Sequence, residues 1–165
     1  MINVLVTSLG SNTAIGVVKA LRYHKDISIT GTDIFSTRLC AGSPLVDSFF
    51  QVPMAITDDY EIQLIKIIKE KNIHCVIPIH DVEVQKIAEI SLKFPKLTFW
   101  AVNNPTIIDL CNNKKQINFF LANQNIQVPA MYNNAKSVIY PAIYKPNKGV
   151  SSKGIKIINS ADESK

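Results

Sequence analysis

The segment Ile2-Asn-Val-Leu-Val-Thr-Ser-Leu-Gly10-Ser-Asn-Thr-Ala-Ile-Gly16 indicates the expected fold class. Residues 2–8 form a β-branched apolar run that is short enough to be a buried strand. A turn follows at residues 9–12, and apolar side chains at helical spacing then predict a helix from Ala14 to Tyr23. A buried strand that leads through a glycine-bearing turn into a helix is typical of the first unit of an α/β domain.

The alternation of strands and helices continues to about residue 104. Further strands are predicted at residues 27–33, 48–52, 73–79 and 97–102, with helices at 57–71 and 81–94 and an irregular stretch at 36–45. The run 73–79 is apolar throughout, as expected of a strand covered on both faces. The sequence therefore predicts an α/β fold with a Rossmann-like, mostly parallel sheet, helices on both faces and right-handed crossovers.

A different pattern begins at Asn104-Pro105. Two short helices are predicted at 105–111 and 114–124, followed by strands at 142–145 and 155–158 that are joined by a polar, glycine-bearing connector. We divide the chain into an α/β domain at 1–104, a helical connection at 105–135 and the start of a further domain at 136–165. Ser160-Ala-Asp-Glu163 is a capping box that predicts a helix start, so we expect the sequence to be cut inside a larger domain.

Charge is distributed unevenly along the 165 residues. Residues 1–112 carry ten basic and eleven acidic side chains, a net charge of −1, whereas residues 113–165 carry eight basic and two acidic ones, a net charge of +6. This concentration favours a local anionic ligand over a protein that coats nucleic acid, since aromatic residues do not alternate with these lysines. Nucleic acid is therefore not an expected partner.

Composition also predicts the cellular compartment. Apolar runs are far shorter than the ~20 residues needed to span a bilayer, and the first residues lack the basic region of a secretory signal. The three cysteines, Cys40, Cys75 and Cys111, are widely and irregularly spaced, which argues against disulfides or a zinc site and for buried thiols. We expect a cytoplasmic protein without a membrane partner.

One candidate site lies where predicted strands end. Gly10 and Asn12 are in the first turn, where a helix amino terminus can bind an anion. Asp81 and Glu83 follow the strand at 73–79, on the edge where open α/β sheets bind ligands. Asp81 is equally well explained as the N-cap of the next helix, with Glu83 favourably placed in its first turn. These four residues are tentative substrate contacts, and their spacing assigns no catalytic acid–base pair.

A second candidate site is the connector. It places Lys145 at the end of an apolar strand, immediately before a turn that offers glycines, hydroxyl groups and backbone N–H groups. Such a segment can bind phosphates, with amides and hydroxyls as donors and lysine as a point charge. It lacks the G-K-[ST] of a Walker loop and joins two strands, so an ordinary surface hairpin with solvated lysines is the alternative.

The order of several motifs resembles a known superfamily. Tyr140-Pro-x-x-x-Lys145-Pro, followed by Gly149-x-x-Ser152-x-Gly154, resembles the start of an ATP-grasp domain. Asn113-Lys114, Phe120-Leu121 and Asn125-Ile126-Gln-Val-Pro129 resemble its D-K, F-L and G-I-x-x-P segments. The motifs Gly10-x-x-x-Ala14-x-Gly16-x-Val18-Lys-Ala-Leu-Arg22 and Ile77-Pro78-x-His-Asp81-x-Glu83 are similar to the N-terminal domain of carbamoyl-phosphate-synthase large-subunit-like proteins.

The resemblance implies a pre-ATP-grasp domain followed by the first part of an ATP-grasp ligase. Such enzymes use ATP and Mg²⁺ to activate a carboxylate as an acyl phosphate, which an amine or similar nucleophile attacks. The ATP-binding residues implied by position are Lys114, Lys145, Gly149, Ser151, Ser152, Lys153 and Gly154. The metal-binding carboxylates and catalytic arginine of the family would lie beyond Lys165, so no catalytic or metal-binding residue is assigned and the fragment is expected to be inactive alone. A homo-oligomer is possible.

Some residues depart from the family pattern. Asn113 replaces the usual Asp, Asn147 stands where Arg is common, and Asn125 replaces a glycine, which is tolerable because Asn visits left-handed conformations. Two other classes stay open. One is a dinucleotide-binding Rossmann domain of an oxidoreductase that would use Gly10, Gly16 and Asp33. The other is a non-catalytic binding module.

Overall fold

The computed structural model of the chain describes residues 1–132, 134–147, 149 and 154–164. The chain divides into two compact units, unit 1 (Met1–Pro105) and unit 2 (Thr106–Lys165). Within the described ranges, no helix combines the length and the apolar character needed to cross a membrane.

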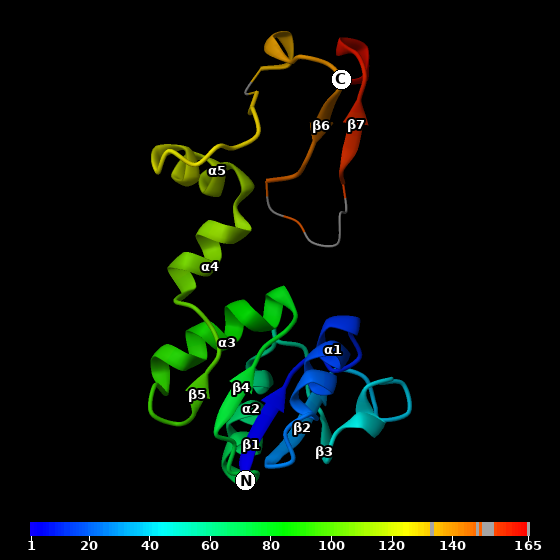
Figure 1. Cartoon of the computed structure of the whole chain (residues 1–165), viewed down its shortest axis with the longest axis vertical. Helices are drawn as coiled ribbons and strands as arrows, with labels where there is room; N and C mark the ends of the chain where they lie inside the picture. The colour runs from blue at the N-terminus through cyan, green and yellow to red at the C-terminus, as the bar shows by residue number, and fades with distance from the viewer. Residues whose placement is uncertain (133, 148, 150–153, 165) are drawn as a thin grey trace. The chain divides into compact units, whose positions relative to one another are not determined.

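A five-stranded parallel sheet forms the centre of unit 1 (Figure 1). Its strand order is β3-β2-β1-β4-β5, so the direction of strand addition reverses between β1 and β4. The strands are β1 (Ile2–Val6), β2 (Ile27–Asp33), β3 (Ser48–Gln51), β4 (Cys75–Ile77) and β5 (Phe99–Trp100), and the helices are α1 (Asn12–Leu21), α2 (Asp58–Glu70) and α3 (Asp81–Lys93). The predicted α/β fold with a mostly parallel sheet is confirmed.

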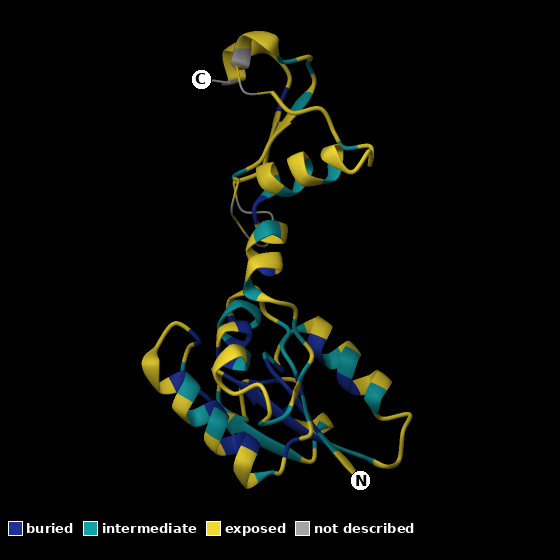
Figure 2. Cartoon of the chain, turned by 90° about the vertical axis from the view of Figure 1, so that its left-hand side faces the viewer, coloured by how far each residue is buried: buried dark blue, intermediate teal, exposed yellow. Residues whose placement is uncertain are grey.

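Successive residues of β1 serve two cores on opposite faces of this sheet. Val4 and Val6 pack with Val18 of α1 in one buried cluster. Leu5, which points the other way in the pleat, packs in a second cluster with α2 and α3 side chains such as Leu64. Figure 2 shows the buried residues of unit 1 gathered on the sheet and on the inner sides of its helices. Helices therefore cover both faces, as predicted.

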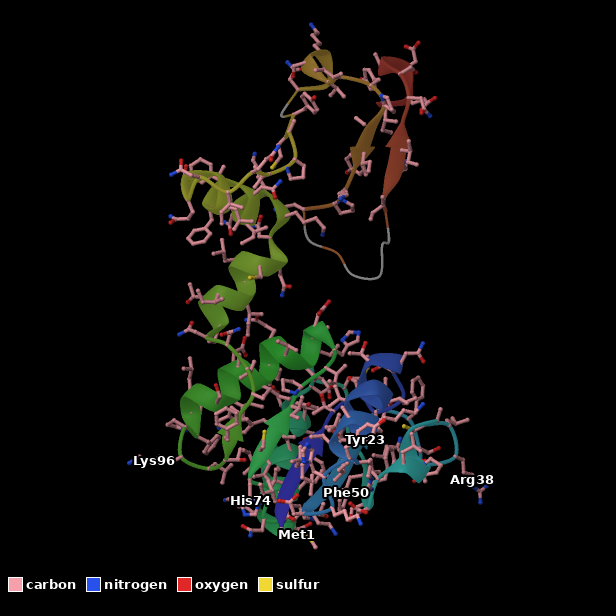
Figure 3. All side chains as sticks on the ribbon, viewed as in Figure 1. Met1, Tyr23, Arg38, Phe50, His74 and Lys96 are labelled. Carbon is pink, nitrogen blue, oxygen red and sulfur yellow. The ribbon has the colours of Figure 1, made fainter. Side chains whose placement is uncertain are left out.

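The amino end of the sheet is held by a reciprocal contact between β1 and the start of β4. The Asn3 amide donates to His74 Nδ1 at 2.9 Å, and the His74 amide donates to the Asn3 carbonyl at 2.8 Å. Figure 3 shows the labelled His74 beside Met1 at this end of the sheet. These two bonds fasten β1 to the residue before β4 at the amino end of the sheet.

The starts of α2 and α3 differ in detail from the sequence-based interpretation. His80 is the N-cap of α3 and its Nδ1 accepts from the Val82 amide at 3.3 Å, so the interpretation of Asp81 as the cap is wrong by one residue. Asp81 is the first helical residue, because the chain leaves β4 extended and turns only after His80. Thr57 is the N-cap residue of α2, which begins one residue later than predicted, and its hydroxyl donates to the Met54 carbonyl and accepts from no helix amide.

Unit 2 contains short elements. After α4 (Pro105–Asn112) come α5 (Lys114–Asn123), the 3₁₀ turn η2 (Ala135–Ser137), strands β6 (Ala142–Tyr144) and β7 (Lys156–Ile158), and the 3₁₀ turn η3 (Ala161–Ser164). β6 and β7 pair antiparallel, with Ile143 opposite Ile157. The connector (residues 145–154) joins them, and residues 145–147, 149 and 154 of it are described.

The structure decides three local expectations, which concern Asn125, the capping box at residues 160–163 and the burial of the cysteines. Asn125 has φ 59°, which confirms that it occupies a left-handed position in place of glycine. Glu163 accepts from the Asn159 amide, one residue earlier than the capping box requires, and a 3₁₀ turn forms there, so that box is wrong in detail. Cys40 is buried and Cys75 partly buried, but Cys111 is exposed, contrary to the expectation of buried thiols.

Candidate functional site

The carboxyl ends of β1 and β4 meet where the strand order reverses, which is the position at which open α/β sheets bind ligands. The β1–α1 turn follows β1, and the residues that lead into α3 follow β4. The Thr7 amide donates to the Ile77 carbonyl at 3.2 Å, and Thr7 Oγ1 accepts from the Ile79 amide at 3.3 Å. These bonds continue the contact between the two chain segments beyond the last residues of their strands.

Glu83 connects the β1–α1 turn to the buried Tyr60 of α2. Its side chain lies in the first turn of α3 and is 6% exposed. Tyr60 of α2 donates from its hydroxyl to Glu83 Oε1 at 2.8 Å, and Ser8 donates from Oγ to Glu83 Oε2. Burial, followed by the nearby Glu83 carboxylate, strongly raises the pKa of Tyr60, so the phenol keeps its proton and remains a donor. Both oxygens of Glu83 are therefore engaged inside the protein.

Ser8, at the start of the β1–α1 turn, is the residue of that turn that Glu83 contacts. It has φ 49°, a left-handed conformation that is costly for a residue with a side chain. The bond from its hydroxyl to Glu83 ties this conformation to the buried carboxylate. The Glu83 carboxylate is buried and bonded to Ser8 and Tyr60, and its contact with substrate stays a prediction.

Asp33, at the end of β2, holds the same turn from the other side. Its Oδ2 accepts from the Gly10 amide at 2.7 Å and its Oδ1 from the Phe35 amide at 3.0 Å. A Cβ at Gly10 would lie 3.2 Å from that Oδ2, which explains why glycine suits the position. Asp33 is thus used by backbone amides, unlike the ribose-binding acid of a dinucleotide site.

The β1–α1 turn departs from the dinucleotide fingerprint G-x-G-x-x-G at two positions. Counted from Gly10, the second glycine position is Asn12 and the third, where the helix packs closely on the strand, is Ile15. The neighbouring Gly16 does not take over this packing role, because a Cβ there would have no atom within 4 Å. Together with Asn12 at the second glycine position, this geometry argues against the dinucleotide-binding alternative. Asn12 is the first residue of α1 and is exposed, as is Asp81 of α3. Both remain accessible at the carboxyl edge of the sheet.

The second candidate site is formed inside unit 2 by α5 and the connector. Lys114 begins α5, and its amide donates to the Asn147 carbonyl at 3.1 Å. Lys114 Nζ reaches the Gly149 carbonyl at 3.4 Å, so two of the predicted ATP-binding residues are brought together. Lys145 is exposed just after β6.

Gly154 ends the connector. Gly154 has φ 75°, and a Cβ there would approach Pro146 Cγ to 2.9 Å, so the end of the connector requires glycine. Ser151, Ser152 and Lys153, which were also predicted to bind ATP, lie outside the described residues. The roles of all these residues toward ATP stay predictions.

The ligand chemistry that the described residues fit is that of an anion. Lys114 and Lys145 supply positive charge of the kind that binds phosphate as a point charge. No group of three or more His, Cys, Asp or Glu side chains in the described part of the chain could hold a metal ion. The two lysines suit the phosphates of ATP, whereas the described residues offer no cluster that would hold Mg²⁺ directly.

Sequence reasoning missed the roles of three residues. The helix predicted at 57–71 does not single out Tyr60, because helical spacing does not reveal a hydroxyl that reaches a carboxylate on another helix. Ser8 is the last residue of the strand predicted at 2–8, and that prediction gives it no contact with Glu83. Asn147 was noted only as a departure from a family pattern, although its position beside a predicted phosphate-binding lysine could have drawn attention to it.

Comparisons with known proteins agree with this fold. The family model described as PylC-like, N-terminal domain matches residues 4–100. No curated protein matches the chain. The L-amino acid ligase from Bacillus licheniformis is structurally similar with a TM-score of 0.72 and 12% identity, over 99% of this chain and 40% of that one.

Two carboxylases give similar results. The biotin carboxylase domain of the Hydrogenobacter thermophilus 2-oxoglutarate carboxylase, solved with MgADP, ADP and bicarbonate, has a TM-score of 0.68 and 16% identity over 98% of this chain and 38% of that one. The corresponding values for Rhizobium etli pyruvate carboxylase are 0.70 and 17%, over 96% and 16%. The chain thus spans less than half the length of each of these proteins, and at such identities the likeness concerns the fold.

The family model confirms the expected N-terminal domain, and the structural neighbours agree with its fold. The match runs from the third residue of β1 to the end of β5, so it includes part or all of each of the five strands and the turn held by Glu83 and Asp33. Because the family model matches residues 4–100, more than half of the sequence, the chain belongs to the family of PylC-like N-terminal domains.

Proposed function

We propose that the protein containing this chain is an ATP-dependent ligase. A carboxylate oxygen of the substrate attacks the γ-phosphorus of ATP, the bond to the bridging oxygen breaks, and ADP leaves. An amine nitrogen then attacks the acyl carbon, phosphate leaves with the bonding electron pair, and the nitrogen loses a proton. A relation to carbamoyl-phosphate synthase large subunits is a finer form of the same proposal.

The observation that carries the proposal is the meeting of α5 and the connector. Lys114 and Gly149, far apart in sequence and both implied in ATP binding by the resemblance, are in contact through Lys114 Nζ. The contact supports a single phosphate-binding surface there, on which Lys114 and Lys145 would offset the charge of the transferred phosphoryl group. A structural neighbour solved with MgADP supports the same ligand class.

The substrate carboxylate is assigned to the carboxyl edge of the sheet in unit 1. Gly10 and Asn12 would offer the first turn of α1, and Asp81 would lie beside the substrate at the start of α3. Glu83 would act through Ser8, whose conformation it holds. Mg²⁺ enters only as the counter-ion of ATP, and the cytoplasmic location and homo-oligomeric state remain part of the proposal.

The test is calorimetric titration of the whole protein with MgATP and with NAD(H). MgATP is expected to bind, and Lys145→Ala is expected to weaken binding while Lys96→Ala does not, since Lys96 is an exposed lysine in unit 1 (Figure 3). Tight NAD(H) binding that is lost in Gly10→Val, without MgATP binding, would contradict the ligase proposal and favour the dinucleotide-binding alternative.

A further inference from the structure

Asn147 makes a two-point attachment to the start of α5. Its carbonyl oxygen accepts from the Lys114 amide at 3.1 Å, and its side-chain Oδ1 accepts from the Lys115 amide at 2.9 Å. Backbone and side chain of one connector residue therefore satisfy the first two amides of the helix. Such amides have no partner within their own helix, so the attachment stabilises α5 and the connector together.

Asn113 completes the same arrangement. It is the N-cap of α5, is 9% exposed, and accepts from the Gln116 amide through Oδ1 at 3.1 Å. The first three amides of α5 thus have acceptors inside unit 2. A helix amino terminus commonly binds phosphate through such amides, but here they are already used, so a phosphate at this place would depend on lysine side chains.

The attachment limits how far apart the backbones of those lysines can lie. Lys114 is itself one of the two donors to Asn147. Lys145 precedes Asn147 by two residues, a span of at most about 7 Å along the chain. The two cations repel each other when they are brought to one place, and an anion bound between them would relieve that repulsion. The side-chain Oδ1 of Asn147 carries no net charge, so it accepts from the Lys115 amide without neutralising either lysine.

We propose that Asn147 is a positioning residue for ATP, which fastens the end of β6 to the first turn of α5 and so sets Lys114 and Lys145 on one phosphate-binding surface. This inference rests on the proposed function. It assigns no contact between Asn147 and the nucleotide. Its effect reaches ATP through the placement of the two lysines.

The first test compares Asn147→Ala with the wild-type whole protein. Loss of the Oδ1 acceptor is expected to speed amide hydrogen exchange at Lys115 by about 5- to 10-fold and to raise the Kd for MgATP by a similar factor, the effect of one lost hydrogen bond. Asn147→Asp retains an acceptor and is expected to keep exchange at Lys115 within about twofold of wild type. Asn123→Ala, at the other end of α5, is the matched control and should change neither quantity.

A second pair of variants removes the same bond from the donor side. Lys115→Pro deletes the amide hydrogen, and proline is tolerated in the first turn of a helix. Lys115→Ala removes the same charge but keeps the amide. A Kd for MgATP that is higher in Lys115→Pro than in Lys115→Ala supports the proposal even where Asn147→Ala fails to fold.

The outcomes separate this inference from the proposed function. If wild type binds MgATP and Asn147→Ala, folded and with faster exchange at Lys115, keeps the wild-type Kd, the attachment is merely structural and the inference is overturned while the ligase proposal stands. Equal Kd values in Lys115→Pro and Lys115→Ala overturn it in the same way. If wild type does not bind MgATP, both proposals fail.

Discussion

The hydrogen bond from Tyr60 to Glu83 joins two helices beneath the candidate substrate site. Tyr60 is 0% exposed, so Tyr60→Phe removes a donor and leaves Glu83 Oε1 buried without it. We expect the free energy of unfolding to fall by about 1–3 kcal/mol, the cost of leaving a buried acceptor unsatisfied. Denaturant unfolding of the two proteins measures the change.

The control for this substitution is Tyr23→Phe, because Tyr23 is 87% exposed (Figure 3) and its hydroxyl is expected to bond to water in both the folded and the unfolded chain. It should leave the denaturation midpoint unchanged. An equal effect of the two substitutions would mean that the contact with Glu83 contributes nothing to the stability of the turn.

Asp47 gives the fold a dependence on pH. Hydrogen bonds from Arg22, at 2.9 Å to Oδ1 and 3.0 Å to Oδ2, hold the pKa of the Asp47 carboxyl below its usual value, and the Ile29 amide adds to this. A carboxyl whose pKa is lowered by folding contributes stability above the unfolded value of about 3.9, and this contribution disappears as pH falls through the lower folded value.

We therefore expect wild type to exceed Asp47→Asn in stability most clearly above about pH 5, with the difference shrinking toward about pH 2. Urea unfolding at a series of pH values measures it. Arg22→Met should reduce the same pH-dependent contribution, since it removes the main cause of the shift. A difference between wild type and Asp47→Asn that is constant across this range would contradict the assignment.

At the scale of elements, two glycines of unit 1 have opposite roles. A Cβ at Gly42 would lie 2.4 Å from the Leu9 carbonyl oxygen, so the chain before the short 3₁₀ turn η1 (Ser43–Leu45) passes directly against the β1–α1 turn. Gly16 lies within α1, and a Cβ there would have no atom within 4 Å. The same substitution should therefore change stability in opposite directions at the two sites.

Gly42→Ala is expected to lower the free energy of unfolding by about 1–3 kcal/mol, because backbone must move to admit the methyl group. Gly16→Ala is expected to raise it by about 0.5–1 kcal/mol, since alanine loses less backbone entropy in a helix. Thermal unfolding of both variants measures the two effects. Destabilisation by Gly16→Ala would contradict the open space that the structure shows around Gly16.

The elements themselves could largely be predicted from sequence, and their contacts could not. Apolar runs and helical spacing located every strand of the sheet, because burial on both faces leaves a pattern in each local segment. The cap of α3 was misplaced by one residue, since Asp is a preferred N-cap residue by type whereas the path of the chain out of β4 puts His80 at that position.

The candidate sites were predictable to a similar, limited extent. The resemblance implied that Lys114 and Gly149 serve one ligand, and they are in contact. The engagement of both Glu83 oxygens and the use of Asp33 by the Gly10 amide depend on side chains from different helices and strands, which no local pattern records.

At the scale of the whole molecule, the two units differ in how much apolar surface they bury. Unit 1 has two buried clusters, one on each face of its sheet. In unit 2, the buried apolar side chains among the described residues are Ile108 and Ile158. Phe119 and Ile157 are 70% and 67% exposed there, so the hydrophobic contribution to the stability of unit 2 is small.

Because each unit has its own buried residues, we expect this chain to unfold in two thermal transitions, with unit 2 unfolding first. A ligand that binds only the folded form stabilises the unit that holds it, by about 2.7 kcal/mol when its concentration is 100 times its Kd. MgATP should therefore raise the lower transition, whereas Gly42→Ala should lower only the upper one. Differential scanning calorimetry with and without MgATP measures both transition temperatures. If MgATP raised only the upper transition, the nucleotide would bind to unit 1, which would contradict the assignment of Lys114 and Lys145.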